Sequence, residues 1–142
     1  MARAINYRQE DFVAVIKDAT GGKGVDVILD MVGAPYWEQN LASLAQAGRL
    51  ILVSAQGGGR LEITLGAIQA KRARVIGTML RPLPLAEKVD LTEQFMTFAL
   101  DRFADGRLVP VIDRVFPLEE APAAHRYMES NANIGKIVLR VR

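Results

Sequence analysis

The chain has 142 residues, of which half are hydrophobic and 24% are charged, so it can form a compact domain with a sizeable core. The formal net charge is only +2 and positive charge clusters only at residues 70–74, which argues against a nucleic-acid partner. The absence of cysteine, the single histidine and the lack of a long apolar run argue against disulfides, a metal site and a membrane span, and favour a cytoplasmic protein.

The first 54 residues predict two helices and two strands. Apolar positions on one helical face predict a helix over residues 12–19. Branched apolar side chains run almost continuously through residues 25–32, as in a strand covered on both faces. A helix is expected to begin near Pro35 and to end at Gly48, followed by a buried strand over residues 49–54. The inward positions of that helix are Trp37, Leu41, Leu44 and Ala45.

The middle of the chain continues this alternation. A loop at residues 55–60 precedes a short helix at residues 65–71 and a third strand at residues 74–80. A proline-containing connector leads to a long helix over residues 86–104. We expect its aromatic side chains to lie in the core; these are Phe95, Phe98 and Phe103.

The tail differs in character. Residues 111–117 alternate as a half-exposed strand does, residues 118–130 form a helical pattern, and residues 136–141 form a closing strand. His125 lies on an apolar face of the predicted helix, which favours a structural histidine with satisfied hydrogen bonds.

The alternation of strands and helices predicts an α/β fold with a doubly wound parallel sheet. Ligands of such sheets lie beyond the carboxyl ends of the strands, and the residues at these ends are small or apolar here. The glycines at 57–59 follow a strand, but they suit a flexible turn as well as a cofactor contact. Asp26 and Asp30 share one side of a strand, where a structural role is favoured over paired catalytic carboxylates.

Four stretches resemble the quinone oxidoreductase branch of the medium-chain dehydrogenase/reductases. They are "INYRQEDF" at 5–12, the sequence from 21 to 50 beginning "GGKGVDVILDMVG", "PVIDRVFPLEEAPAAHRYMES" at 110–130 and "NIGKIVLRV" at 133–141. The resemblance runs in order through essentially the whole chain.

The resemblance implies an incomplete Rossmann-type sheet, its second half, followed by a strand-helix-strand tail. Residues 1–107 would be the second half of an NADPH-binding domain, and residues 108–142 would pack with an N-terminal catalytic domain that this sequence lacks. Residues 4–7 would correspond to strand 3 of the family, so strand 1 and its glycine-rich phosphate loop would also be missing. The strand at 25–32 would then expose an unpaired edge.

The resemblance also implies a cofactor, NADPH with NADH as the alternative, and hydride transfer to a quinone or other conjugated carbonyl without zinc. No catalytic or metal-binding residue is assigned within the chain. The positions that would contact the cofactor are Tyr7, Met31, Val32, Gly33, Ser54, Ala55, Gln56, Gly57, Thr78, Met79, Leu80 and Asn133. Several have plainer interpretations: Tyr7 could cover a helix end, Gly33 and Asn133 could be turn residues, and Thr78 could pack within a strand.

Family dimers suggest that residues 74–80 pair with a second copy at the sheet edge. We expect this chain to be inactive by itself. The alternative is a non-catalytic dimerisation module derived from such an enzyme. A methyltransferase is disfavoured, because the tail does not predict an antiparallel hairpin.

Overall fold

The computed structural model describes residues 3–142, which divide into two compact units, one that ends at Leu83 and one that begins at Pro84. No helix within residues 3–142 has both the length and the apolar character needed to cross a membrane. The expected functional division at residues 107 and 108 stays a prediction.

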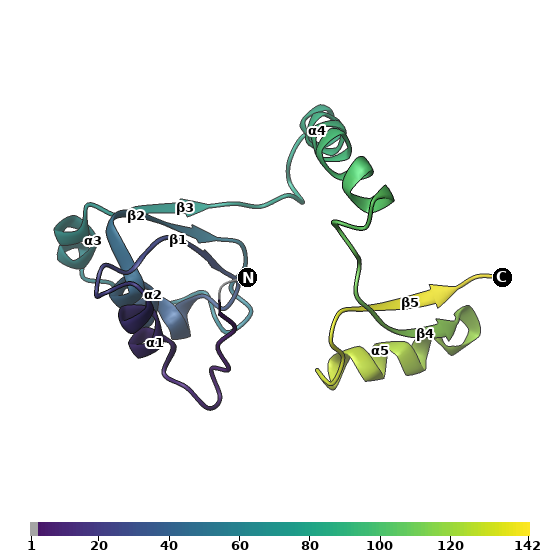
Figure 1. The fold of residues 1–142 in the computed structure, drawn as a ribbon, viewed down its shortest axis with the longest axis horizontal. Helices are drawn as coiled ribbons and strands as arrows, with labels where there is room; N and C mark the ends of the chain where they lie inside the picture. The colour runs from purple at the N-terminus through teal and green to yellow at the C-terminus, as the bar shows by residue number, and fades with distance from the viewer. Residues whose placement is uncertain (1–2) are drawn as a thin grey trace. The chain divides into compact units, whose positions relative to one another are not determined.

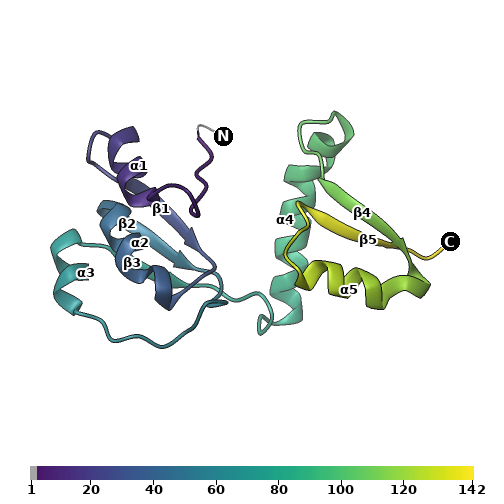
Figure 2. The ribbon, with the colours of Figure 1, turned by 90° about the horizontal axis from the view of Figure 1, so that it is seen from below.

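The first unit contains a three-stranded parallel sheet in the order β1-β2-β3 (Figures 1 and 2). Ile28, Leu50 and Val75 lie in register across it. This confirms the predicted α/β class with parallel strands. The elements are α1 (Phe12–Ala19), β1 (Val25–Asp30), the 3-10 helix η1 (Ala34–Tyr36), α2 (Trp37–Ser43), β2 (Leu44–Leu52), α3 (Leu65–Lys71) and β3 (Arg74–Gly77).

The core lies on one face of this sheet. Trp37 and Leu41 of α2 pack with Leu50 of β2, and Ile68 of α3 packs against the same cluster. On the opposite face the side chains of Val27 and Leu29 are 41% and 65% exposed. The expectation of a strand covered on both faces is therefore wrong for β1, because one of its two faces is exposed.

Several further boundaries differ from the sequence expectations. β1 ends at Asp30 and not at residue 32, and β3 ends at Gly77 and not at residue 80. Residues 4–7 are not a strand, since no strand neighbour is available to bond with them in the described chain. The helix that begins after Pro35 ends at Ser43, five residues before Gly48. Leu44 has an extended backbone and pairs with Val25. Strand β2 therefore begins where the apolar pattern predicted that the helix would continue.

The second unit contains a long helix and a small parallel strand pair. Its elements are α4 (Leu85–Ala104), β4 (Ile112–Pro117), the 3-10 helix η2 (Leu118–Glu120), α5 (Ala121–Glu129) and β5 (Lys136–Arg140). β4 and β5 pair in parallel, with α5 as the connection between them. Phe116 of β4 and Ala124 of α5 are buried. This arrangement is the strand-helix-strand tail that the sequence predicted.

Two expectations about side chains in this unit are wrong. Phe95, Phe98 and Phe103 of α4 are about half exposed and do not form a core. His125 is exposed and makes no side-chain hydrogen bond within residues 3–142. In both cases the helical pattern identified an apolar face correctly, but this part of the chain does not bury it.

Candidate functional site

The carboxyl end of β1 is organised by the buried carboxylate of Asp30. Its two oxygens accept hydrogen bonds from the main-chain N–H groups of Val32 and Gly33, at 2.9 and 3.0 Å. Its main-chain carbonyl accepts from the N–H of Val53 at 2.8 Å. The expectation that Asp30 is structural and meets neighbouring N–H groups is confirmed.

The loops that follow β1 and β2 are joined by main-chain hydrogen bonds. The N–H of Gly57 donates to the carbonyl of Val32 at 2.9 Å, and the N–H of Ala34 donates to the carbonyl of Gly58 at 2.9 Å. Gly33 has a φ of +88°, and a Cβ at this position would lie 2.6 Å from the Gly58 carbonyl oxygen. The close approach of the two loops therefore requires glycine at residue 33.

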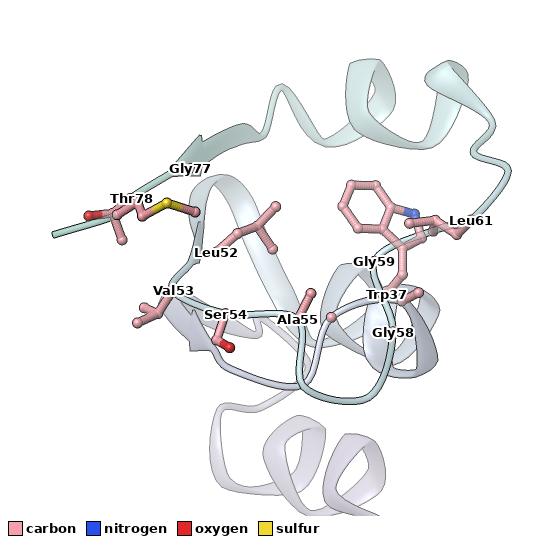
Figure 3. A pocket seen from close by; sticks show the side chains of 13 residues that line it. Trp37, Leu52, Val53, Ser54, Ala55, Gly58, Gly59, Leu61, Gly77 and Thr78 are labelled. Atoms are coloured by element: carbon pink, nitrogen blue, oxygen red, sulfur yellow. The ribbon is translucent and has the colours of Figure 1, made fainter. Parts of the chain in front are cut away.

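A pocket of about 420 Å³ lies beyond the carboxyl ends of the three strands, within the first unit. Figure 3 shows the indole of Trp37 and the side chain of Leu61 at one end of the view and Thr78 at the other, with Leu52 between them. Its lining is predominantly apolar, and the volume falls in the range of small-molecule sites. A flat, uncharged ring could lie against these apolar walls.

The structure groups some of the predicted cofactor residues and leaves others apart. Five line this pocket, namely Gly33, Ser54, Ala55, Thr78 and Met79. Three line a second pocket of about 300 Å³, namely Tyr7, Met31 and Val32. Four lie outside both, namely Gln56, Gly57, Leu80 and Asn133.

The second pocket contains aromatic side chains close to the predicted Tyr7. The ring of Tyr36 lies 6.5 Å from that of Tyr7, in an edge-to-face arrangement, and 5.4 Å from that of Phe12. Tyr7 itself is largely exposed, so one side of its ring is available to a ligand. A ring system could stack there, because aromatic faces attract other flat rings.

Asn133 lies in the second unit, in a loop held by Asp113 of β4. The carboxylate of Asp113 accepts from the N–H of Ile134 at 3.1 Å and from the hydroxyl of Tyr127 at 2.9 Å. These two hydrogen bonds lower the pKa of Asp113, the one from Ile134 first, and the bond to the carboxylate raises the pKa of Tyr127. The Asn133 amide donates to the carbonyl of Gly135 at 3.1 Å, which is the contact of a turn residue.

The sequence interpretation missed several pocket residues, among them Trp37, Leu52 and Leu61. Trp37 was assigned to the inward stripe of its helix, and it is indeed buried, but it also borders the pocket. A signal was present, because Trp37 follows the turn at Gly33 closely and so begins its helix near the strand ends.

Residues 3–142 bring together no group of three or more His, Asp or Glu side chains that could hold a metal ion.

The sequence profile of a family described as zinc-binding dehydrogenase matches residues 1–139. Quinone oxidoreductase 1 of Escherichia coli is 32% identical over 143 residues, which is 96% of this chain and 42% of that protein. A 2-haloacrylate reductase of Burkholderia sp. is also 32% identical, over 95% of this chain and 40% of that protein. The chain thus spans about two fifths of the length of the curated relatives it matches.

Solved structures share the fold. The crystal structure of the Escherichia coli quinone oxidoreductase complexed with NADPH superimposes with a TM-score of 0.76 at 29% sequence identity. The superposition covers 96% of this chain and 42% of that one. The three-stranded sheet and the tail therefore have counterparts in a much longer protein.

Proposed function

Because the chain belongs to the zinc-binding dehydrogenase family, we propose that it is the cofactor-binding portion of an NADPH-dependent reductase of quinones or other conjugated carbonyls. It corresponds to the C-terminal part of the quinone oxidoreductases of that family. The proposal includes an N-terminal catalytic domain as the partner that completes the substrate site. The isolated chain would then bind cofactor weakly and lack activity.

The observation that supports this proposal best is the apolar pocket at the strand ends. Five of the twelve positions implied by the family resemblance line it, and it lies where ligands of doubly wound sheets bind. Bound NADPH would supply a hydride to the acceptor. The chain's own residues would hold the nicotinamide ring, with Leu52 and Trp37 excluding water and the hydroxyl of Thr78 available to the carboxamide.

The adenosine half would lie toward the second pocket. There Tyr7 offers an exposed ring, and the turn at Met31 and Val32 is held in place by Asp30. We also propose Asn133 as a cofactor contact, as the family resemblance implies. NADPH is preferred to NADH because the related Escherichia coli structure contains NADPH.

Trp37 is the single tryptophan of the chain and lines the pocket, so its fluorescence reports on occupancy directly. We expect NADPH to quench this fluorescence in the 142-residue chain. Tyr7→Ala and Asn133→Ala should each weaken binding about tenfold, the loss expected of one good contact. Asp18→Ala, on the exposed side of α1, is the control and should leave the titration unchanged. Saturating NADPH without any change in Trp37 emission would contradict the proposed position of the ring.

A second candidate, the non-catalytic dimerisation module, is favoured by β3. This strand pairs with β2 on one side and with no other strand of residues 3–142, and Val75 and Ile76 are exposed. We propose pairing of the β3 edges of two copies in either case. A tight dimer that binds no NADPH would support the module over the reductase.

A further inference from the structure

The loop formed by residues 131–135 carries Asn133 and is fastened at its end to the residue before β4. The N–H of Lys136 donates to the carbonyl of Val111 at 2.8 Å. Gly135 has a φ of +106°, and a Cβ at this position would lie 2.5 Å from the same carbonyl oxygen. The main chain alone therefore holds the end of the loop against the strand pair.

The middle of the loop has a second attachment, which is made by side chains. The carboxylate of Asp113 accepts from the N–H of Ile134 at 3.1 Å and from the hydroxyl of Tyr127 at 2.9 Å. Tyr127 is itself held in place, since the guanidinium carbon of Arg114 lies 4.2 Å from the centre of its ring. Asp113 and Tyr127 thus act on the loop as a pair.

Asp113 is placed at the loop by an irregularity of β4. Ile112 pairs with Lys136 and Arg114 pairs with Ile137, so Asp113 is one extra residue on β4 and has no partner on β5. Such a bulge is rare between parallel strands, redirects a side chain, and is common beside active sites. Here it adds an attachment to a solvent-exposed loop whose end is already fastened, which points to a role for a residue that the loop presents.

The residue that the loop presents is Asn133, which is half-buried. Its Nδ2 atom donates to the carbonyl of Gly135 at 3.1 Å, and this bond fixes the orientation of the amide. Its Oδ1 atom accepts no hydrogen bond within residues 3–142, although an amide oxygen can accept two. The oxygen is therefore a fixed acceptor for an O–H or N–H group of a ligand.

We propose that Asp113 and Tyr127 are positioning residues for cofactor binding, which hold the N–H of Ile134 so that the Oδ1 atom of Asn133 accepts from a donor group of the bound cofactor. This inference rests on the proposed function, which assigns Asn133 to the cofactor, and adds two residues that touch no ligand themselves. A loop that is ordered beforehand avoids the entropic cost of being ordered on binding, so the pair raises the affinity for the cofactor.

Isothermal titration calorimetry of the 142-residue chain with NADPH tests this effect. Asp113→Asn should weaken binding about fivefold and Tyr127→Phe about threefold, because the loop must then be ordered on binding. The loss cannot come from charge, since removing a carboxylate would by itself favour an anionic ligand. Glu129→Gln is the matched control, because it removes one carboxylate from an exposed position of the same unit and should change affinity by less than about twofold.

Hydrogen exchange of the Ile134 amide in the nucleotide-free chain tests the structural half of the proposal. The exchange rate should rise at least about tenfold in Asp113→Asn and should stay unchanged in Glu129→Gln. Equal exchange rates in these two variants would overturn the proposal, because the carboxylate would then not hold the loop.

A double-mutant cycle separates positioning from a general effect on the second unit. In the Asn133→Ala background Asp113→Asn should change the affinity for NADPH by less than about 1.5-fold, since the contact through which it acts is gone. Additive losses, or an Asp113→Asn variant that binds as tightly as the parent, would overturn the proposal. Titrations of Asn133→Ala with AMP and with nicotinamide mononucleotide then assign the donor to the half of the cofactor whose binding weakens, and weakening of neither would also overturn it.

Failure of this inference is distinguishable from failure of the proposed function. If Asn133→Ala binds NADPH as tightly as the parent, the positioning role falls, while the response of Trp37 to NADPH still tests the pocket separately. A parent chain that binds no NADPH would contradict the proposed function and this inference together.

Discussion

At the scale of single residues, Asp30 and Asp113 have the same structural role in the two units. Each carboxylate accepts hydrogen bonds from the main chain of a loop that carries predicted cofactor residues. The donors are the N–H groups of Val32 and Gly33 for Asp30, and the N–H of Ile134 for Asp113. Neither was predicted to touch a ligand. Their importance lies in setting the loop conformation.

Asp30→Ala should destabilise the first unit by about 2 kcal/mol, because two partly buried N–H groups lose their acceptor. Urea denaturation followed by Trp37 fluorescence measures this change. Asp26→Ala removes an exposed carboxylate from the same strand and should stay within about 0.5 kcal/mol of the parent. Equal effects of the two substitutions would refute the role given to Asp30.

Asp113 should make the second unit sensitive to acid. Its pKa is lowered in the folded chain by the Ile134 N–H and the Tyr127 hydroxyl, so its stabilising effect is present above the unfolded pKa of about 3.9. That effect is lost as the pH falls through the lower, folded pKa. In an NMR titration the Ile134 amide shift should change with a midpoint below about 3.9.

Tyr127→Phe should move that midpoint upward, because the carboxylate loses one of its two donors. Asp113→Asn should abolish the titration of the Ile134 amide. It should also destabilise the unit at neutral pH and have little effect once the pH lies below both the folded and the unfolded pKa of Asp113. A midpoint at or above the ordinary aspartate value would contradict the hydrogen bonds described here.

At the scale of elements, the helical and strand patterns located apolar faces more reliably than they predicted burial. β1 was expected to be covered on both faces and α4 to pack through its aromatic stripe, yet both leave apolar side chains exposed. An apolar face is a property of local sequence, whereas its burial requires a second element to lie against it.

The contrast within α4 gives a test. Phe95 is 56% exposed, so Phe95→Ser should change stability by less than about 1 kcal/mol and should reduce aggregation. Ala99, one turn further, is 1% exposed, so Ala99→Leu should cost about 1–3 kcal/mol through overpacking. Thermal unfolding by circular dichroism compares the two variants. A larger loss for Phe95→Ser would mean that α4 packs through its aromatic stripe.

At the scale of the whole molecule, the sheet of the first unit ends in two different edges. The second pocket lies beside β1, whereas β3 is an exposed strand at the other edge. The proposed dimer uses only the β3 edge. Single substitutions can separate them because each edge has outward N–H groups of its own.

The proposed dimer predicts that sedimentation velocity of the 142-residue chain yields twice the monomer mass of 15.6 kDa. Val75→Pro should return the species to a monomer by removing an outward N–H from β3. Val27→Pro should leave the dimer unchanged. A dimer that survives Val75→Pro would exclude pairing through the β3 edge.

The sequence by itself determined the α/β class, the parallel pairing, the tail and the start of nearly every helix and strand. These features follow from periodicity and turn residues, which act over a few neighbouring positions. The structural role of Asp30 was predictable for the same reason, since its partners are two and three residues away. The family resemblance added the prediction of which strand ends contact the cofactor.

Only the tertiary structure decided that residues 4–7 are not a strand, that α2 ends at Ser43, and that Trp37, Leu52 and Leu61 border a pocket. It also decided that the Asn40 Nδ2 and Ser43 Oγ atoms are buried without a hydrogen-bond partner in residues 3–142. Each of these depends on which segments meet in space. Strand pairing, burial and polar satisfaction are contacts between distant residues, so no local pattern can specify them.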